Sequence, residues 1–182
     1  MFRHILISLF VITLISPITI NAKEGQEIFS RVVINNGEHI IAGDSTVFSV
    51  IIYSNLPFGE IKCTDSNVKI SGCRVRQTYQ GNGRRQSRSY LGGRAYYSTV
   101  WSQYVIGSNN KGKYTFPSLS FSAQLYIEQS DDIDPFDPFG FFRQPRYKKV
   151  KATLKSPETK FEIIDQPRKS TEELMKSGKT VI

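Results

Sequence analysis

The chain has few of the residues and motifs on which enzyme active sites are built. Its 182 residues include two histidines, of which only His39 remains if the first 22 residues are removed. The motifs G-x-S-x-G and H-E-x-x-H and the P-loop are all absent. A serine-histidine-aspartate arrangement would need His39 as its base, and no nucleophile motif accompanies it. We therefore expect no enzymatic activity and no cofactor. The missing motifs do not exclude one class of enzyme, a hydrolase that uses two carboxylates.

Long apolar runs are also missing. The longest, Ile5–Ile15, is short against the roughly 20 residues that a membrane-spanning helix needs. It follows the basic Arg3, is broken at Pro17, and is succeeded by the small residue Ala22 before a charged segment. This order is typical of a cleavable secretory signal, and a retained membrane anchor is the alternative. We expect residues 1–22 to be a signal peptide and the mature chain to be exported to the periplasm or cell envelope without a transmembrane helix.

Cysteine is scarce as well, with Cys63 and Cys73 as the two examples. The C-x-x-C spacing of catalytic redox pairs is absent. An even number of cysteines in an oxidising compartment favours a disulfide. We expect a Cys63–Cys73 bridge that staples two neighbouring strands across a turn, with two unpaired buried thiols as the alternative.

Acidic residues are outnumbered by basic ones, and the formal net charge is +8. This excess favours anionic partners such as envelope phosphates, lipid head groups or acidic protein faces. We expect no nucleic-acid partner, because an exported protein rarely meets one. The alternative is that the excess positive charge only keeps the protein soluble and serves no partner.

What the chain does contain is a series of short β-type segments. The clearest is 96–127, where YYSTVWSQYVIGS breaks at the turn residues NNKGK and resumes as YTFPSLSFSAQLYI. In TVFSVIIYS, residues 46–54, the apolar side chains Phe48, Val50 and Ile52 share one face and are predicted to be core. The pattern predicts an all-β fold, an immunoglobulin-like β-sandwich with two long loop insertions.

The strand that begins near Tyr96 also carries the single tryptophan. Its spacing places Val100, Tyr104 and Ile106 on one face and Trp101 on the other. A lone tryptophan is a possible platform for carbohydrate, but in a sandwich such a ring more often packs between strands. In the following strand, Pro117 interrupts the alternation and is predicted to mark a bulge or a sheet edge.

The first insertion, residues 80–95, reads QGNGRRQSRSYLGGRA and cannot form a core. We expect it to be a long, exposed hairpin tip. Arginines beside aromatic residues on a glycine-rich segment can bind phosphate or carboxylate groups. The alternative is a solvated loop whose charges keep a sheet edge from pairing. The candidate anion-binding residues are Arg84, Arg85, Arg88 and Arg94.

The second insertion, residues 128–145, reads EQSDDIDPFDPFGFFRQP. Its aspartates, Asp131, Asp132, Asp134 and Asp137, lack the spacing of a calcium-binding EF-hand loop, so we expect no metal site. Its phenylalanines are too many for a loop of this size to bury, which favours a docking surface. The alternative is that they fold back and cap the core. The candidate docking residues are Phe136, Phe139, Phe141 and Phe142.

The last strands complete the predicted domain. Residues 147–154 alternate, with Val150, Ala152 and Leu154 inward and the lysines at positions 149, 151 and 155 outward. After Phe161 and Ile163 the composition becomes charged and nearly free of apolar residues. We expect one sandwich domain over residues 23–165 and a charged C-terminal tail over residues 166–182.

Residues from about 33 to 165 resemble the BatD family of exported, aerotolerance-associated proteins, in the versions with a Pro-Phe-rich insertion. The resemblance rests on the segments GDSTVFSVIIYS, WSQYVIGSNNKGKYTFPSLSF and PFDPFGFFRQPRYKKVKATLKSPETKFEI. It implies an immunoglobulin-like sandwich in the bacterial envelope. It also implies a non-enzymatic accessory role, linked to oxygen tolerance, toward membrane proteins with von Willebrand A domains and a MoxR-type ATPase.

Two functional hypotheses from different classes follow. The first is a protein-interaction module that docks through the phenylalanine-rich insertion or an open sheet edge. The second is an exported module that binds glycans or anionic polymers through Trp101, the tyrosines and the arginine-rich loop.

Overall fold

The computed structural model describes residues 25–83, 85–129 and 146–166, and these form eleven β-strands and no helix. The described part therefore contains no helix that could cross a membrane. The strands are β1 (Ile28–Ile34), β2 (His39–Ile41), β3 (Ser45–Ser54), β4 (Phe58–Cys63), β5 (Arg74–Gln80), β6 (Ser87–Leu91), β7 (Arg94–Gly107), β8 (Gly112–Phe116), β9 (Ser120–Gln129), β10 (Arg146–Lys155) and β11 (Thr159–Ile164).

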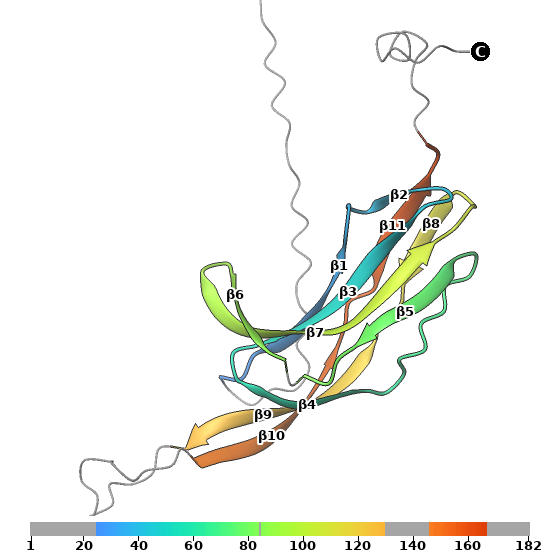
Figure 1. Ribbon diagram of the computed structural model, residues 1–182. Coiled ribbons are helices and arrows are strands. Elements are labelled where there is room, and N and C mark those ends of the chain that lie inside the picture. Colours follow the sequence, from blue (N-terminus) through green and yellow to red (C-terminus); the bar gives the residue numbers. More distant parts are fainter. Residues whose placement is uncertain (1–24, 84, 130–145, 167–182) are drawn as a thin grey trace, which may run out of the picture.

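The strands form two layers (Figure 1). One layer is a five-stranded sheet in the order β1-β3-β7-β5, with β6 also paired to β7. The other consists of two three-stranded sheets, β10-β9-β4 and β2-β11-β8. Both breaks between these two sheets contain a proline: Pro117 separates β8 from β9, and Pro157 separates β10 from β11. Proline cannot donate to a sheet ladder, so it lies where strand pairing is interrupted, as predicted for Pro117.

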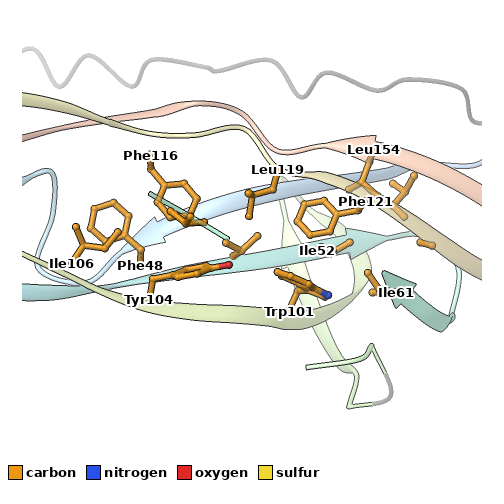
Figure 2. Packing of buried hydrophobic residues seen from close by; sticks show 14 of the residues in the cluster. Phe48, Ile52, Ile61, Trp101, Tyr104, Ile106, Phe116, Leu119, Phe121 and Leu154 are labelled. Atoms are coloured by element: carbon orange, nitrogen blue, oxygen red, sulfur yellow. The ribbon is translucent and has the colours of Figure 1, made fainter. Parts of the chain in front are cut away.

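The core lies between the layers, and aromatic side chains from both of them meet in it (Figure 2). The ring of Phe48 on β3 stacks on that of Phe116 on β8 at a centroid distance of 5.6 Å, and Tyr104 on β7 meets Phe116 edge-on. The predicted core residues Phe48, Val50 and Ile52 are fully buried. The all-β sandwich is therefore confirmed, while its assignment to the immunoglobulin-like type stays a prediction.

Trp101 occupies a β-bulge that changes which face of β7 each side chain takes. Val50 pairs with Ser102 and Ile51 with Val100, so Trp101 has no partner on β3. Its side chain is 1% exposed and its ring lies 5.1 Å from that of Phe121, edge to face. The prediction that Trp101 lies opposite Tyr104 is therefore wrong, because the extra residue shifts the alternation. Trp101 is a packing residue and is not available to stack on carbohydrate.

The first insertion is also more regular than predicted. Instead of one long tip, residues 80–95 include the strand β6, which pairs with β7 from Ser87↔Ser98 to Leu91↔Arg94. The turn consists of Gly92 and Gly93, whose φ angles of 55° and 78° suit a two-residue hairpin turn. The resulting β6–β7 hairpin curls away from the rest of its sheet (Figure 1).

Candidate binding surfaces

The β9–β10 hairpin extends beyond the other strands as a two-stranded arm (Figure 1). Its ten residue pairs run from Ser120↔Lys155 to Gln129↔Arg146 without a register shift. Leu125 on β9 is the last fully buried residue toward the tip, and Arg146–Lys149 on β10 are all exposed. We call the whole hairpin of β9 and β10 the β9–β10 arm. Its distal residues, 126–129 and 146–149, present regular backbone beyond the last fully buried side chain.

One face of this hairpin carries a row of cations, Lys149, Lys151 and Lys155, which we call the lysine stripe. Lys149 and Lys151 are two residues apart on one strand face, which separates them by about 7 Å, and Lys155 follows about 13 Å beyond Lys151, with Thr153 between them. All three side chains are exposed, and none makes a salt bridge with any residue that the structure describes. The rings of Tyr126 and Tyr147 lie on the same face, with centroids 6.2 Å apart. In the sequence these lysines form only the outward side of an alternating strand, a pattern that does not mark a binding site.

The predicted docking residues Phe136, Phe139, Phe141 and Phe142 lie outside the described residues, as do the four aspartates of that insertion. The structure does show where the insertion is attached. Residues 130–145 connect Gln129, the end of β9, to Arg146, the start of β10. The insertion therefore continues from the tip of the arm.

The three candidate anion-binding arginines that the structure describes have different contacts. The Arg88 guanidinium lies 3.8 Å from the ring centroid of Tyr97 and donates to its hydroxyl at 2.6 Å. Arg94 Nη1 lies 3.7 Å from Glu27 Oε2, which also accepts a hydrogen bond from the Tyr96 hydroxyl. Two of the four arginines are thus engaged within the fold. Of the others, Arg84 lies outside the described residues and Arg85 lines a hollow described below.

Beneath the β6–β7 hairpin is a second, smaller hydrophobic cluster of Phe29, Tyr53 and Tyr96. Phe29 stacks on Tyr53 at 5.2 Å and meets Tyr96 edge-on at 5.3 Å. The cluster lies on the face of the five-stranded sheet turned away from the main core, because Phe29 and Tyr53 alternate with the core residues Ile28 and Ile52. Leu91 at the end of β6 packs against it. The cluster therefore fastens the hairpin to the outer face of the sheet.

The segment that joins β5 to β6 ties the two layers together. The Phe58 amide donates to Gln86 Oε1 at 2.9 Å, and Gln86 Nε2 donates to the Phe58 carbonyl at 2.7 Å. The side-chain amide of Gln86 thereby replaces a neighbouring strand on this edge of β4. Gly83 has a φ of +83°, and a Cβ there would lie 2.9 Å from Ile61, so the close approach requires glycine.

A hollow of about 530 Å³ lies on the outer face of the five-stranded sheet, between β5, the β6–β7 hairpin and the sheet itself. We call it the outer hollow. It contains hydroxyl groups, two tyrosines and one arginine, and no acidic side chain lines it. The residues that line it are Ile51, Tyr53, Tyr79, Arg85, Ser87, Ser89, Ser98, Thr99, Val100 and Gln103.

The polar groups of the outer hollow are mostly neutral. Ser89 and Ser98 share a hydrogen bond of 2.7 Å between their hydroxyl oxygens. Burial raises the pKa of the Tyr53 hydroxyl, an effect that the neighbouring Arg31 partly opposes, so this group stays protonated. Arg85 supplies the positive charge and pairs with no carboxylate among the described residues. The alternation of β3 in the sequence already predicts that Tyr53 faces away from the core. Only the tertiary structure shows which residues of β5, β6 and β7 lie beside it.

The predicted disulfide is absent, and Cys63 and Cys73 are free thiols. The prediction assumed that the two cysteines staple neighbouring strands. Instead β4, which ends at Cys63, pairs with β9, whereas β5, which follows Cys73, pairs with β7 in the other layer. The connection between them does contain a turn at Ser71 and Gly72, where the Cys73 amide donates to the Ile70 carbonyl at 3.0 Å, but this turn does not join two paired strands. The Cys63 thiol donates to the Asp65 carbonyl, and burial raises the pKa of both thiols.

His39 lies at the exposed edge strand β2. Its Nδ1 atom is 3.7 Å from Glu162 Oε2, and both side chains are open to solvent. Within the described ranges no group of three His, Cys, Asp or Glu side chains is arranged to hold a metal ion.

No family model, curated protein or solved structure matches this chain. The resemblance to BatD thus stays a prediction. Function has to be argued from the chain's own surfaces, of which the β9–β10 arm with its lysine stripe and the outer hollow are the two most distinctive.

Proposed function

We propose that this chain is a non-enzymatic interaction module of the cell envelope that docks on an acidic face of a partner protein through the β9–β10 arm. The observation that supports the proposal is the combination of a projecting, regular hairpin with three exposed lysines, Lys149, Lys151 and Lys155, that make no salt bridge with any described residue. An acidic partner face would supply carboxylates for these lysines to pair with. Charge complementarity of this kind raises the rate and specificity of association.

The exposed backbone of the arm supports the same conclusion. A two-stranded hairpin without further packing is marginally stable in water. The strand pairing nevertheless continues in register from Ile127↔Lys148 to Gln129↔Arg146, beyond Leu125, the last buried residue of β9. A partner that covers this hairpin would bury its two exposed faces, and tyrosines such as Tyr147 are enriched in protein interfaces.

The phenylalanine-rich insertion adds the apolar component that most interfaces need. In the sequence it connects the last residue of β9 to the first residue of β10, and it includes Phe139 and Phe142. Buried aromatic anchors surrounded by polar contacts are the usual source of interface energy. In this proposal the insertion supplies the anchors and the lysine stripe supplies the charge.

The resemblance to BatD specifies the partner. It implies membrane proteins that carry von Willebrand A domains and work with a MoxR-type ATPase, and a role linked to oxygen tolerance. We propose that these are the partners of the arm.

The test is affinity capture of the chain from detergent-solubilised envelope, with mass spectrometric identification. Three proteins are compared: the unaltered chain, the arm variant Lys149→Glu, Lys151→Glu, Lys155→Glu, and a control. The control, Lys69→Glu, Lys113→Glu, Lys160→Glu, makes the same change of charge at exposed lysines elsewhere on the sandwich. A Phe139→Asp, Phe142→Asp variant tests the insertion in the same way.

We expect the unaltered chain and the control to recover von Willebrand A-type membrane proteins and the arm variant to lose them. Loss should also occur for the unaltered chain as salt is raised, because exposed charges are screened over about 8 Å at physiological ionic strength. Equal recovery by the arm variant and the control would show that the arm is not the docking surface. If the unaltered chain recovers only polysaccharide or lipid and no protein, the docking proposal is wrong and the module that binds glycans or anionic polymers is favoured instead.

A further inference from the structure

The outer hollow exists because the edge of β7 is divided between two strands. β5 pairs with β7 as far as Gln80↔Ser102, and β6 begins at Ser87↔Ser98. The bulged residue Trp101 lies at this division, where its carbonyl accepts a hydrogen bond from the Gly81 amide. The chain then leaves the sheet to reach β4 and returns as β6. The hollow is therefore held by backbone pairing on both sides.

The charge of the hollow selects for anions. Arg85 lies on its rim, and no Asp or Glu is among the residues that line it. A second hollow of about 550 Å³, lined by residues 79–82 and Arg85, shares Arg85 and Tyr79 with the first. The guanidinium is exposed and unpaired within the described part of the chain, so it is free to form a two-point contact with a carboxylate.

The floor of the hollow is suited to hydroxyl groups. Serine hydroxyls and the Gln103 amide can each donate and accept hydrogen bonds, as sugar hydroxyls do. Ile51 and Val100, which pair across β3 and β7, add a small apolar strip. A largely preformed concave site with a few convergent polar groups is the usual form of a small-molecule site, and the volume lies in the typical range of roughly 300–1,000 Å³.

We propose that the outer hollow binds an acidic saccharide, that is, a sugar that carries a carboxylate. Arg85 pairs with the carboxylate, the hydroxyls of Ser87 and Ser89 bind the sugar hydroxyls, and Tyr79 lies against the ring. This site is independent of the proposed docking function, because it lies on the five-stranded layer and the β9–β10 arm belongs to the other layer. Failure of one proposal leaves the other standing.

The test is isothermal titration calorimetry of the full chain with defined probes. Glucuronic acid and N-acetylmuramic acid represent acidic sugars, glucose represents a neutral one, and inorganic phosphate represents an anion without a sugar. Arg85→Gln removes the charge at the rim, and Ser89→Ala removes one hydroxyl from the floor. The matched control is Arg76→Gln. Arg76 is an exposed arginine on the same face of β5 as Tyr79, but it does not line the hollow.

We expect the acidic sugars to bind and Arg85→Gln to weaken that binding at least about tenfold, as the loss of a charge-assisted contact does. Ser89→Ala should weaken it a few-fold, and Arg76→Gln should leave it unchanged. Circular dichroism verifies that each variant is folded.

Four results would overturn the proposal. Equal binding of glucose and glucuronic acid would show that the carboxylate is not recognised. Equal binding of phosphate would reduce the hollow to a simple anion site. Absence of binding by either acidic sugar at millimolar concentration, or equal weakening by Arg85→Gln and Arg76→Gln, would remove the site altogether.

Discussion

The β6–β7 and β9–β10 hairpins are both basic, but their cations have different surroundings. On the first hairpin, Arg88 stacks on Tyr97 and Arg94 pairs with Glu27, while Tyr96 joins an aromatic cluster on the sheet. On the second, the lysine stripe has no ion pair with any described residue, and the tip lies beyond the core. A charge count does not distinguish the two. What distinguishes them is whether the fold supplies an ionic or aromatic partner, as it does for Arg88 and Arg94, or leaves exposed lysines without a salt bridge, as in the lysine stripe.

The comparison therefore predicts that changes in the β6–β7 hairpin alter stability, whereas changes in the β9–β10 arm alter binding. Four experiments test this prediction, and they are given in order of decreasing expected effect on stability.

The largest effect is expected from the cluster beneath the β6–β7 hairpin. Phe29→Ala should lower the free energy of unfolding by about 3 kcal/mol, because the side chain is 5% exposed and its loss leaves a cavity beside Tyr53 and Tyr96. Tyr147→Ala on the arm should cost less than about 1 kcal/mol, since that ring is 52% exposed. Urea unfolding monitored by circular dichroism measures both. Equal losses would mean that the arm is packed as tightly as the hairpin.

A smaller effect is expected at the base of the β6–β7 hairpin. Gln86→Ala removes both hydrogen bonds to the backbone of Phe58, which is 2% exposed, and should cost about 2 kcal/mol because buried groups lose their partners. Gln124→Ala on the outer face of β9 is the control and should change stability by less than about 0.5 kcal/mol. If the two variants unfold alike, Gln86 does not tie the layers together.

Arg88 should contribute less again. Arg88→Ala removes a cation–π contact and a hydrogen bond to Tyr97 at an exposed site, for which a loss of about 1 kcal/mol is expected. A double-mutant cycle with Tyr97→Phe separates the hydrogen bond from the ring contact. Additive effects in that cycle would show that the hydroxyl contact contributes nothing.

The lysine stripe should contribute least to stability. The combined change Lys149→Gln, Lys151→Gln, Lys155→Gln should alter the free energy of unfolding by less than about 0.5 kcal/mol, because exposed charges without partners stabilise little. The same variant should lose the salt-sensitive capture described above. A clear fall in melting temperature would assign these lysines to the fold and weaken their role in docking.

Local patterns predicted much of the fold. The alternation of Phe48, Val50 and Ile52 identified a core strand correctly, because the two-residue period of a strand is set by its own backbone. Pro117 was correctly assigned to an interruption of the sheet for a similarly local reason. The prediction failed at Trp101, where one extra residue relative to β3 inverts the alternation. A bulge is defined by two strands together, so the sequence of one strand does not reveal it.

The candidate sites were less predictable than the fold. The arginine-rich segment was singled out by composition, and its described members have different contacts: Arg88 stacks on Tyr97, Arg94 pairs with Glu27 and Arg85 lines a hollow. The residues that share the hollow come from β3, β5, β6, β7 and the segment between β5 and β6. Cys63 and Cys73 were predicted to bridge because an even number of cysteines in an oxidising compartment favours a disulfide, but the strands next to them pair in different layers.

The sequence alone determined that this chain forms strands, which of their faces are apolar and how basic the surface is, since these properties depend on residue type and on a period of two. The tertiary structure decided which strands are neighbours, and through that choice it decided the rest. Pairing β6 with β7 gave Arg88 a ring to stack on, and pairing β9 with β10 left Lys149 and Lys151 without an ionic partner in the described part of the chain. The physical reason is that the surroundings of a side chain are supplied by residues distant in sequence, and long-range pairing alone brings them together.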